Sequence, residues 1–332
     1  MTGYFVVPDS RVPSGGTTYN RRAGGRLRPV VVAGDWPRPD DAARAGLARA
    51  LAGLPDGAAV LLDGLVACGV PEVVAPHARR LRTAVLVHLP LAEETGLDPA
   101  VAAALDAAER ACLHAVDAVV ATGPTAAERL AAHHGLARVH VVAPGVDPAP
   151  RAPGTDGVSA LLCVASVTPR KGHDVLVEAL ARVADAPWRC ACVGPQEPRH
   201  AASVRAAITR HGLDGRVELV GPLVGTRLDA AYAAADLVVL ASRAETYGMV
   251  VTEALARGLP VVAAAVPDAL GDGGWSVPPG DAVALAAALR RWFHSADDRA
   301  GLREAALRRR AELSPWADTT AGLARVLANL RA

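Results

Sequence analysis

Residues 237–263 read LVVLASRAETYGMVVTEALARGLPVVA, and they already predict a class of fold. The apolar run Leu237–Leu240 leads into a polar loop, which is followed by the helical pattern Thr252–Arg257 and a second apolar run, Pro260–Ala263. A strand, a helix and another strand in this order form a βαβ unit, whose two strands lie parallel in one sheet. The stretch therefore predicts an α/β protein built on a parallel sheet.

The same alternation of short apolar runs and Ala-rich helical segments extends through the rest of the chain. Further strands are predicted at Tyr4–Val7, Val30–Ala33, Val60–Leu62, Ala84–His88, Ala118–Ala121, Val139–Val142, Leu161–Ala165, Arg189–Val193 and Val217–Val220. The segment Asp147–Gly157 is rich in Pro and Gly without apolar periodicity, which is typical of a linker between domains. We therefore predict two Rossmann-like parallel-sheet lobes, residues 1–150 and 151–315, that face a cleft.

Composition and charge narrow the range of partners. The 332 residues exceed the size of about 250–300 residues at which a single core stops growing. The 35 Lys and Arg residues are nearly balanced by 34 Asp and Glu residues, so the net charge of +1 offers no excess to neutralise a nucleic-acid backbone or an anionic membrane. We expect small-molecule ligands and no nucleic-acid partner.

The sequence also predicts location and cysteine chemistry. Asp63 interrupts the long apolar stretch 58–70, and no run of 18 apolar residues occurs, so no integral membrane segment is expected. The apolar run Tyr4–Val7 is too short for a signal peptide, which favours a cytoplasmic protein.

The five cysteines are too scattered for a disulfide framework or a four-ligand metal site, so we expect buried thiols and no metal.

Two features of the first lobe follow predicted strands. Gly15 and Gly16 come after the first strand, where glycines let a backbone approach a ligand and a helix start can face an anion. His88 closes the fourth strand, at the sheet edge where open α/β proteins bind ligands. Taken alone, the two glycines fit a flexible turn equally well, and a single histidine in such a place is more often structural.

The second lobe carries charged groups after two of its strands. Arg170 and Lys171 precede a helix, a combination that favours a polyanion, although a solvated basic loop has the same composition. Glu245 and Glu253 lie eight residues apart on either side of a turn at Gly248. With Glu245 in the loop and Glu253 on the helix, the two carboxylates could bind different hydroxyls of one extended ligand. Taken singly, each is also compatible with a surface carboxylate.

Together these features resemble the family 4 (group 1) glycosyltransferases, retaining enzymes of GT-B fold, over nearly the whole chain. The segment E-T-Y-G-M-V-V-T-E at 245–253, with the strand that follows, matches that family's E-x7-E segment. Supporting features are Gly15-Gly16, His88, Pro144-Gly145-Val146-Asp147, Arg170-Lys171-Gly172 and Val277-Pro278-Pro279-Gly280-Asp281. The helical run in 316–332 resembles the family's terminal helix, which crosses back to the first lobe.

The resemblance implies a role for each residue that matches a family motif. It implies that Glu245, His88 and Lys171 act at the reacting sugar and its leaving diphosphate, and that Glu253 accepts hydrogen bonds from ribose hydroxyls. The donor-binding residues that it implies are Gly15, Gly16, Arg170, Lys171, Gly194, Leu223, Glu245, Tyr247, Gly248, Met249, Val250 and Glu253. The implied co-substrate is a nucleotide-diphosphate sugar, the acceptor is a small molecule or a glycan, and no further cofactor is expected.

The mechanism that the family implies is front-face transfer with retention, in which the leaving diphosphate helps to deprotonate the acceptor. Positioning and electrostatic stabilisation then suffice without a metal ion. Two alternatives stay open at this point. One is a nucleotide-sugar epimerase or another GT-B-like catalyst, and the other is a nucleotide-sugar-binding protein with reduced catalysis.

The chain departs from the family pattern in three places. Relatives carry Gly-Arg where this chain has Ala165-Ser166, so one of the two usual diphosphate cations is missing, and Arg170 is the expected replacement. The first helix is predicted to have at most two turns. The Gly-Gly-x-Pro-Glu loop after the E-x7-E strand is contracted to Val266-Pro267-Asp268.

Overall fold

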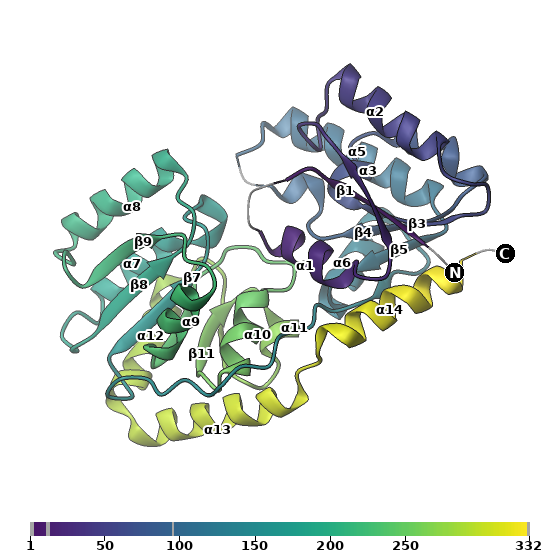
Figure 1. Cartoon of the computed structure of the whole chain (residues 1–332). Helices are drawn as coiled ribbons and strands as arrows, with labels where there is room; N and C mark the ends of the chain where they lie inside the picture. The colour runs from purple at the N-terminus through teal and green to yellow at the C-terminus, as the bar shows by residue number, and fades with distance from the viewer. Residues whose placement is uncertain (1–2, 11–13, 95, 331–332) are drawn as a thin grey trace. The chain divides into compact units, whose positions relative to one another are not determined.

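The computed structural model describes residues 3–10, 14–94 and 96–330, and the chain folds into two compact units. The first unit comprises Met1–Gly145 and Ser314–Ala332, and the second comprises Val146–Leu313 (Figure 1). Each unit has one six-stranded parallel sheet with helices around it. None of the described helices combines the length and the apolar character needed to cross a membrane.

The sheet of the first unit has the strand order β2-β1-β3-β4-β5-β6. Its strands are β1 Tyr4–Pro8, β2 Arg28–Val32, β3 Ala59–Asp63, β4 Arg82–Val87, β5 Ala118–Ala121 and β6 His140–Val141. Its helices are α1 Gly15–Ala23, α2 Asp41–Ala52, α3 Gly64–Ala67, α4 Pro71–Val74, α5 Pro99–Ala115, α6 Pro124–His134 and α14 Trp316–Ala328, with short 3₁₀ turns η1 His77–Arg79 and η2 Leu91–Glu93.

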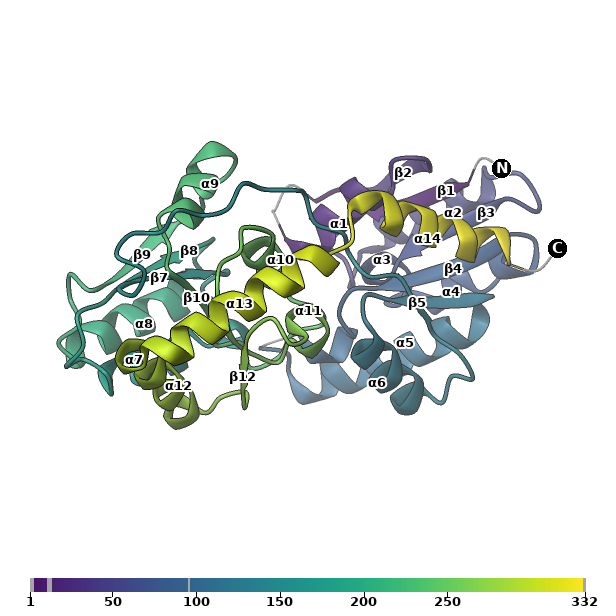
Figure 2. The same cartoon turned by 90° about the horizontal axis from the view of Figure 1, so that it is seen from below.

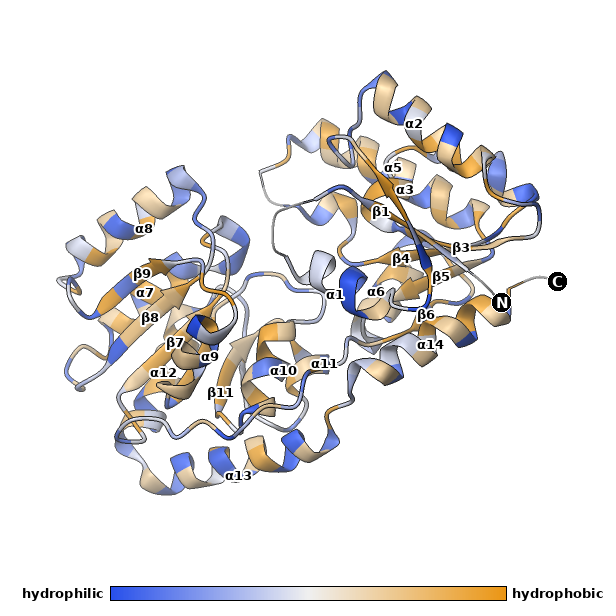
Figure 3. Cartoon of the chain, in the orientation of Figure 1, coloured by the Kyte–Doolittle hydropathy of each residue, from blue (hydrophilic) through white to orange (hydrophobic). Residues whose placement is uncertain are grey.

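Both faces of this sheet are covered, because alternate residues of each strand pack into different cores. Val60 and Leu62 of β3 join the core formed with α2 to α6, whereas Ala59 and Leu61 join the core formed with α1 and α14. A strand buried on both sides needs apolar residues at every position, which explains its continuous apolar sequence. Figure 3 shows this as strands coloured mostly as hydrophobic, with hydrophilic residues concentrated on the helices.

The C-terminal helix α14 belongs to the first unit, as the family resemblance implies. It packs against α1 and over β3 and β4 (Figure 2). Thr319 fixes its first turn by donating to the Ala143 carbonyl at 2.9 Å.

The helix α1 has nine residues, about two and a half turns, which is slightly more than the two turns predicted. Ser14 and Thr17 form a capping box, which starts the helix about one turn before its first buried residue, Tyr19.

The sheet of the second unit has the order β12-β11-β10-β7-β8-β9. Its strands are β7 Ala160–Val164, β8 Arg189–Val193, β9 Val217–Gly221, β10 Leu237–Leu240, β11 Val261–Ala264 and β12 Trp275–Val277. Its helices are α7 His173–Ala181, α8 Pro198–Arg210, α9 Thr226–Ala233, α10 Met249–Ala256, α11 Pro267–Leu270, α12 Ala282–His294 and α13 Ala296–Glu312, with the 3₁₀ turn η3 Pro169–Lys171. The three-residue strand β12 is too short to be recognised from periodicity.

Strand order determines where each sheet opens toward a ligand. In the second unit, chain direction across the sheet reverses between β7 and β10, the doubly wound Rossmann pattern. In the first unit it reverses between β1 and β3. Loops that leave the carboxyl ends of the strands at such a switch point diverge and form a crevice. The segments after β7 and β10, and those after β1 and β3, are therefore the places for functional side chains.

The predicted linker is irregular in structure but is fixed to the second unit. Arg310 donates to the Ala149 carbonyl at 2.9 Å, and the Ala152 N–H donates to the Arg257 carbonyl at 2.9 Å. The Gly154 N–H likewise donates to the Ala233 carbonyl at 3.0 Å. Residues 146–157 therefore pack as part of the second unit.

A buried ionisable pair lies among the helices of the first unit. Glu109 on α5 shares a hydrogen bond with Nε2 of His134 of α6 at 3.1 Å and accepts another from the Leu91 N–H at 3.4 Å. Both side chains are fully buried. Burial raises the pKa of Glu109 from 4.5 to about 7 and lowers the pKa of His134. The folded state therefore holds the Glu109 proton more tightly than the unfolded chain does.

This shift predicts how the stability of the chain responds to pH. The stabilisation from protonated Glu109 is fully present below about pH 4.5 and is lost as the pH rises through about 7. The variant Glu109→Gln lacks this loss, so its melting temperature relative to the parent chain should rise by several degrees between pH 5 and pH 8.5. Melting curves across this range check the prediction, with Glu128→Gln on the exposed face of α6 as the control. A constant difference between parent and Glu109→Gln would contradict it.

Candidate functional site

The segments after β7 and β10 of the second unit meet closely, because a glycine lets them approach. Gly172 has a φ of +65°, and a Cβ built there would lie 2.1 Å from the Ala241 carbonyl oxygen. Any side chain at this position would therefore force the two segments apart. Arg243 holds them together by donating its N–H to the Arg170 carbonyl at 2.8 Å and both guanidinium arms to Asp174 at 2.8 and 2.6 Å.

The predicted cations and the first predicted glutamate lie together at this point. Lys171 Nζ forms an ion pair with Glu245 Oε1, and Arg170 Nη1 lies 3.7 Å from Glu245 Oε2. Ser242 donates its hydroxyl to Glu245 Oε1 at 2.9 Å. The Glu245 side chain is only 8% exposed. Two cations facing one carboxylate leave an excess positive charge, which suits a ligand that carries both phosphates and hydroxyls.

Lys171 is the only lysine in the sequence, and arginine supplies the other 34 basic side chains of the Lys and Arg total. The two residues differ in chemistry, since an ammonium is a compact point charge and a guanidinium is a planar fork. The use of arginine at the other 34 positions makes this ammonium chemically distinct within the chain.

The helix α10 begins beside this group at a glycine in the left-handed region. Gly248 has a φ of +91°, and a Cβ there would lie 2.4 Å from Cγ1 of Val266, so the turn requires glycine. Tyr247, Met249 and Val250, the other predicted donor-binding residues of this turn, are partly buried. The first backbone N–H groups of α10 have no partner within the helix and are suited to oxygen atoms of a ligand.

Glu253 lies on α10 and is held by a tyrosine that no sequence motif marks. Tyr232 of α9, which is fully buried, donates its hydroxyl to Glu253 Oε2 at 2.9 Å. Arg257 lies over the Tyr232 ring at 4.4 Å and donates to the Glu253 carbonyl at 2.9 Å. Burial raises the pKa of Glu253, while Tyr232 and Arg257 partly oppose this. One carboxylate oxygen of Glu253 is thus committed to Tyr232.

The two residues predicted to contact a base have clear structural surroundings. Gly194 follows β8, and a Cβ at this position would lie 2.1 Å from the Ala165 carbonyl oxygen, so close packing of the backbone explains the glycine. Leu223 follows β9 and packs, partly buried, against the core of the second unit. A role in binding a base stays a prediction for both.

In the first unit, the two predicted glycines and the histidine lie in contact. Gly15 and Gly16 are the first two residues of α1 rather than part of a loop. A Cβ at Gly16 would lie 3.3 Å from Cδ2 of His88, so the helix start packs directly on the imidazole. His88 Nε2 is bonded to Asn20 Oδ1 at 2.8 Å. Burial lowers the pKa of His88, and the charge of Asp63 partly opposes this.

Sequence reasoning missed the side chains that hold the predicted ones. Ser242, Tyr232, Asn20 and Asp63 each contact a predicted site residue or its direct partner. Asp63 and Ser242 carried a usable signal, since each is a polar residue at or just after the end of a buried strand. Tyr232 and Asn20 sit on helices without any motif.

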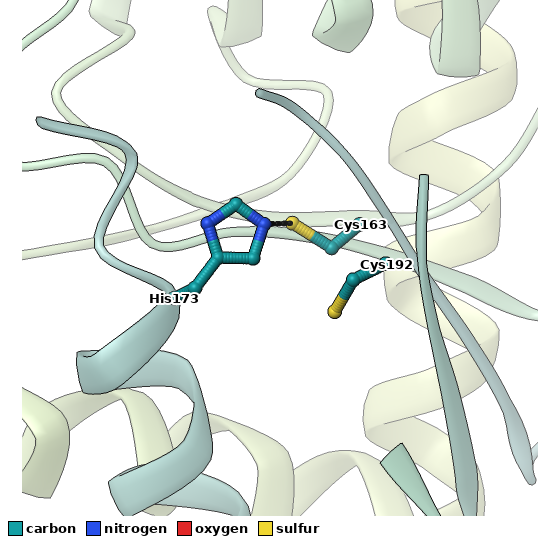
Figure 4. Close-up of side chains that lie close together, drawn as sticks. All are labelled: Cys163, His173 and Cys192. Atoms are coloured by element: carbon teal, nitrogen blue, oxygen red, sulfur yellow. Dashed lines mark hydrogen bonds between the residues drawn. The ribbon is translucent and has the colours of Figure 1, made fainter. Parts of the chain in front are cut away.

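The structure also brings together three potential metal ligands that sequence spacing does not reveal. Cys163 of β7 and Cys192 of β8 are partners in the parallel register, and His173, at the start of α7, lies beside them (Figure 4). Their ligand atoms all lie within 4.8 Å of one another. Among residues 3–10, 14–94 and 96–330, no fourth Cys, His, Asp or Glu joins this group.

We interpret these three residues as part of the core. The cysteine thiols of the chain are all buried and free. The hydrogen bond with Cys192 and then burial raise the pKa of Cys163; at Cys192 the hydrogen bond with Cys163 lowers the pKa, but Cys190 and burial together outweigh it and raise the pKa. Raised thiol pKa values disfavour the thiolate form that binds metals. The Cys163 thiol lies 3.8 Å from Nε2 of His173, a distance at which it can donate to the ring (Figure 4). The cysteines thus behave as the buried thiols that the sequence predicts.

Comparison with known proteins connects this geometry to a family. Residues 159–295 match the family described as Glycosyl transferases group 1. The chain is 32% identical over 294 residues to a D-inositol 3-phosphate glycosyltransferase of Streptosporangium roseum, a match covering 80% of this chain and 65% of the relative. It is 36% identical over 221 residues to D-inositol 3-phosphate glycosyltransferase 1 of Catenulispora acidiphila, covering 60% and 51%. The chain thus spans between half and two thirds of the length of these relatives.

Solved structures resemble the whole chain. Anabaena Alr3699/HepE in complex with UDP and glucose has a TM-score of 0.79 and 19% identity, covering 99% of this chain and all of that one. Sucrose-phosphate synthase from Thermosynechococcus elongatus has a TM-score of 0.78 and 19% identity, covering 98% of each chain. At this identity the likeness shows the fold, which is the GT-B fold that the sequence predicts.

Proposed function

The chain belongs to the glycosyl transferases group 1 family, and we propose that it transfers a sugar from a nucleotide-diphosphate sugar to a hydroxyl acceptor with retention. The observation that carries this proposal is the group formed by Arg170, Lys171 and Glu245 at the switch point of the second sheet. Cations and a carboxylate side by side match a donor in which a diphosphate is joined to a polyhydroxy ring. The family match covers this part of the chain.

We assign roles by combining this geometry with the family resemblance. Lys171 and Arg170 hold the diphosphate, and the N–H groups at Gly248, Met249 and Val250 add hydrogen bonds to phosphate or sugar oxygens. Glu245 accepts from hydroxyls of the transferred sugar.

The remaining predicted residues complete this assignment. Glu253 keeps one oxygen for the ribose, since Tyr232 occupies the other. In the first unit, Gly15, Gly16 and His88 serve the sugar and its phosphate. Tyr247, Gly194 and Leu223 line the donor site, the last two beside the base.

The proposed mechanism is metal-independent front-face transfer. As the sugar–phosphate bond breaks, negative charge grows on the diphosphate, where Lys171 and Arg170 are already positioned. Preorganised charges of this kind stabilise a transition state more than a ground state, because the charge they face develops during the reaction. The leaving phosphate oxygen takes the acceptor proton, so the chain need not supply a general base.

The names of the relatives indicate which substrates to test first. UDP is present in the Anabaena structure, which makes UDP-sugars the first donors to examine. D-inositol 3-phosphate is named for the curated relatives, which makes it the first acceptor. The cytoplasmic location expected from the N-terminal sequence stays a prediction.

Donor binding and transfer can be measured separately. We expect one of UDP-, GDP-, ADP- and TDP-glucose to raise the melting temperature, since a ligand at about 100 times its Kd adds about 2.7 kcal/mol of stability. The variants Glu245→Ala and Glu253→Ala should lose transfer, whereas Glu218→Ala on the exposed face of β9 should keep it. NMR of the product should show the anomeric configuration of the donor, with or without EDTA.

Each other outcome favours a named alternative. An isomerised donor without a new glycosidic bond would point to an epimerase, and donor binding without transfer or hydrolysis would point to a binding protein. Inversion of the anomeric centre would refute front-face transfer. Full activity of both glutamate variants would refute the site assignment.

A further inference from the structure

An extended polar network lies at the switch point of the first sheet. Asp63 is both the last residue of β3 and the N-cap of α3, and it is only 3% exposed. Its Oδ1 accepts from the Leu65 N–H at 2.8 Å, and its Oδ2 accepts from the side-chain amide of Asn20. Asn20 in turn reaches His88, which follows β4. Three segments far apart in the sequence thus form one hydrogen-bonded chain.

The chemistry of each group fixes the direction of these hydrogen bonds. A carboxylate only accepts, so Asn20 must turn its NH₂ group toward Asp63. Asn20 then presents its carbonyl oxygen Oδ1 to His88, and Nε2 of His88 must carry the proton that it donates at 2.8 Å. In neutral imidazole the proton on Nε2 leaves Nδ1 with a free lone pair. Among the described residues, Nδ1 of His88 has no hydrogen-bond partner.

One face of α1 holds the imidazole ring in this orientation. Gly16, Tyr19 and Asn20 are spaced at i, i+3 and i+4, so they lie on the same side of the helix. Gly16 packs on the ring carbons, and the Tyr19 ring meets the imidazole edge-on with centroids 5.1 Å apart. Tyr19 is itself fixed, because its hydroxyl donates to the Val142 carbonyl at 2.9 Å. The ring therefore has little freedom to rotate.

We propose that Asp63, acting through Asn20, is a positioning residue that holds His88 as the Nε2–H tautomer, with Nδ1 ready to accept a hydrogen bond from a hydroxyl of the transferred sugar. This proposal rests on the proposed function, since it deepens the role of His88. The hydroxyl donates to Nδ1, so the site selects a donor sugar that has a hydroxyl at this point. Asp63 contacts Asn20, and Asn20 contacts His88; neither residue needs to contact the substrate.

Replacing Asp63 by asparagine should reverse the network. The single carbonyl oxygen of asparagine is needed by the Leu65 N–H, so its NH₂ group faces Asn20. Asn20 must then flip and offer its own NH₂ to His88, which moves the imidazole proton to Nδ1. The Nδ1 atom becomes a donor and no longer accepts from the sugar hydroxyl. The fold is nearly unchanged in this variant, because the α3 cap is kept.

Nitrogen NMR of the full chain tests the tautomer without any substrate. Two-bond ¹H–¹⁵N spectra distinguish Nδ1–H from Nε2–H, and His88→Gln identifies the signal of His88 by its loss. We expect Nε2–H in the parent chain and Nδ1–H in Asp63→Asn. The control Asp40→Asn changes the N-cap carboxylate of α2, which lies in the same unit without contact to His88, and should leave the spectrum unchanged.

Kinetics with a donor that the chain accepts test the consequence. We expect Asp63→Asn and Asn20→Ala to lower kcat by about 10- to 100-fold with donor KM nearly unchanged, and Asp40→Asn to keep both. Asn20→Ala leaves Asp63 and the α3 cap in place, and a thermal melt of this variant separates a folding defect from a loss of kcat. A matching fall in the two variants supports the network.

Other outcomes separate this proposal from the proposed function. A parent chain with His88 protonated on Nδ1, or an unchanged tautomer in Asp63→Asn, overturns the positioning role whatever the activity. The expected tautomers together with no transfer by the parent chain would refute the proposed function and leave the network established. Normal kcat in Asp63→Asn, with the tautomer switched, would overturn the link to the sugar hydroxyl.

Discussion

Replacing Lys171 by alanine is expected to lower sugar transfer by about 10²- to 10³-fold, the usual cost of removing one preorganised group from a developing negative charge. The substitution removes the cation that contacts Glu245 and leaves that buried carboxylate with Ser242 and the more distant Arg170. In the proposed function Lys171 holds the diphosphate and Glu245 binds the sugar, so we expect kcat to fall more than donor affinity. Steady-state kinetics with the accepted donor provide the measurement.

Two further variants separate charge from shape at this position. Lys171→Arg keeps the charge but replaces a compact ammonium by a wider fork, and we expect it to recover only part of the lost rate. Arg170→Ala should mainly weaken donor binding. The Arg170 guanidinium lies 3.7 Å from Glu245, which Lys171 contacts more closely, and it also donates to the Ala244 carbonyl. An unchanged donor affinity in Arg170→Ala would show that Arg170 does not replace the missing family cation.

The single lysine makes a direct check of donor contact possible. Reductive methylation with ¹³C-formaldehyde labels only amines, so the side-chain signal in the spectrum comes from Lys171 alone. We expect this signal to shift when the nucleotide-sugar is added and to disappear in Lys171→Arg. A signal that ignores a saturating donor would contradict the proposed contact, even if the variant kinetics were as predicted.

Local pattern was enough to predict most of the fold. Each apolar run assigned as a strand overlaps a strand of the structure, because parallel strands buried on both faces must be continuously apolar. One strand of the structure, β12, was not predicted, because its three residues include Ser276 and form no apolar run. The helix α1 is slightly longer than the two turns predicted, because a Ser–Thr capping box begins it at Gly15.

Short segments were enough to name the candidate residues, but not the contacts that hold them in place. The 245–253 segment supplies Glu245, the turn at Gly248 and Glu253 in a fixed spacing, so a single sequence reveals it. Asp63, Asn20 and His88 come together only through the order of strands and the placement of α1. The same holds for Cys163 and Cys192, which become neighbours through the register of β7 with β8. Contacts of this kind follow from topology rather than from spacing.

The largest loss of stability is expected on replacing Asp236 by alanine. This buried carboxylate precedes β10 and accepts from the N–H groups of Thr155 at 2.7 Å, Gly157 at 3.1 Å and Ala160 at 3.0 Å. The Thr155 hydroxyl adds a fourth bond at 2.6 Å. In the alanine variant these donors lose an acceptor that is only 4% exposed, and each such loss costs about 1–3 kcal/mol.

We therefore expect Asp236→Ala to lower the free energy of unfolding by about 4 kcal/mol or more, which places it among the rare severe substitutions. For a folding unit of the size of Val146–Leu313, which contains Asp236, this loss corresponds to a fall in melting temperature of about 8–16 °C. Thermal and urea melts of the full chain provide the measurement. Asp236→Asn, which keeps one acceptor oxygen and the shape of the side chain, should fall between the alanine variant and the parent.

The neighbouring Asp156 provides a matched control for this prediction. Asp156 also caps backbone N–H groups, those of Val158 and Ser159 at 2.8 Å, but its side chain is exposed. Water can replace the lost acceptor there, so Asp156→Ala should cost only about 1 kcal/mol. Equal losses in the two variants would mean that burial does not set the cost. The irregular segment before β7 would then be held by its apolar contacts rather than by the Asp236 carboxylate.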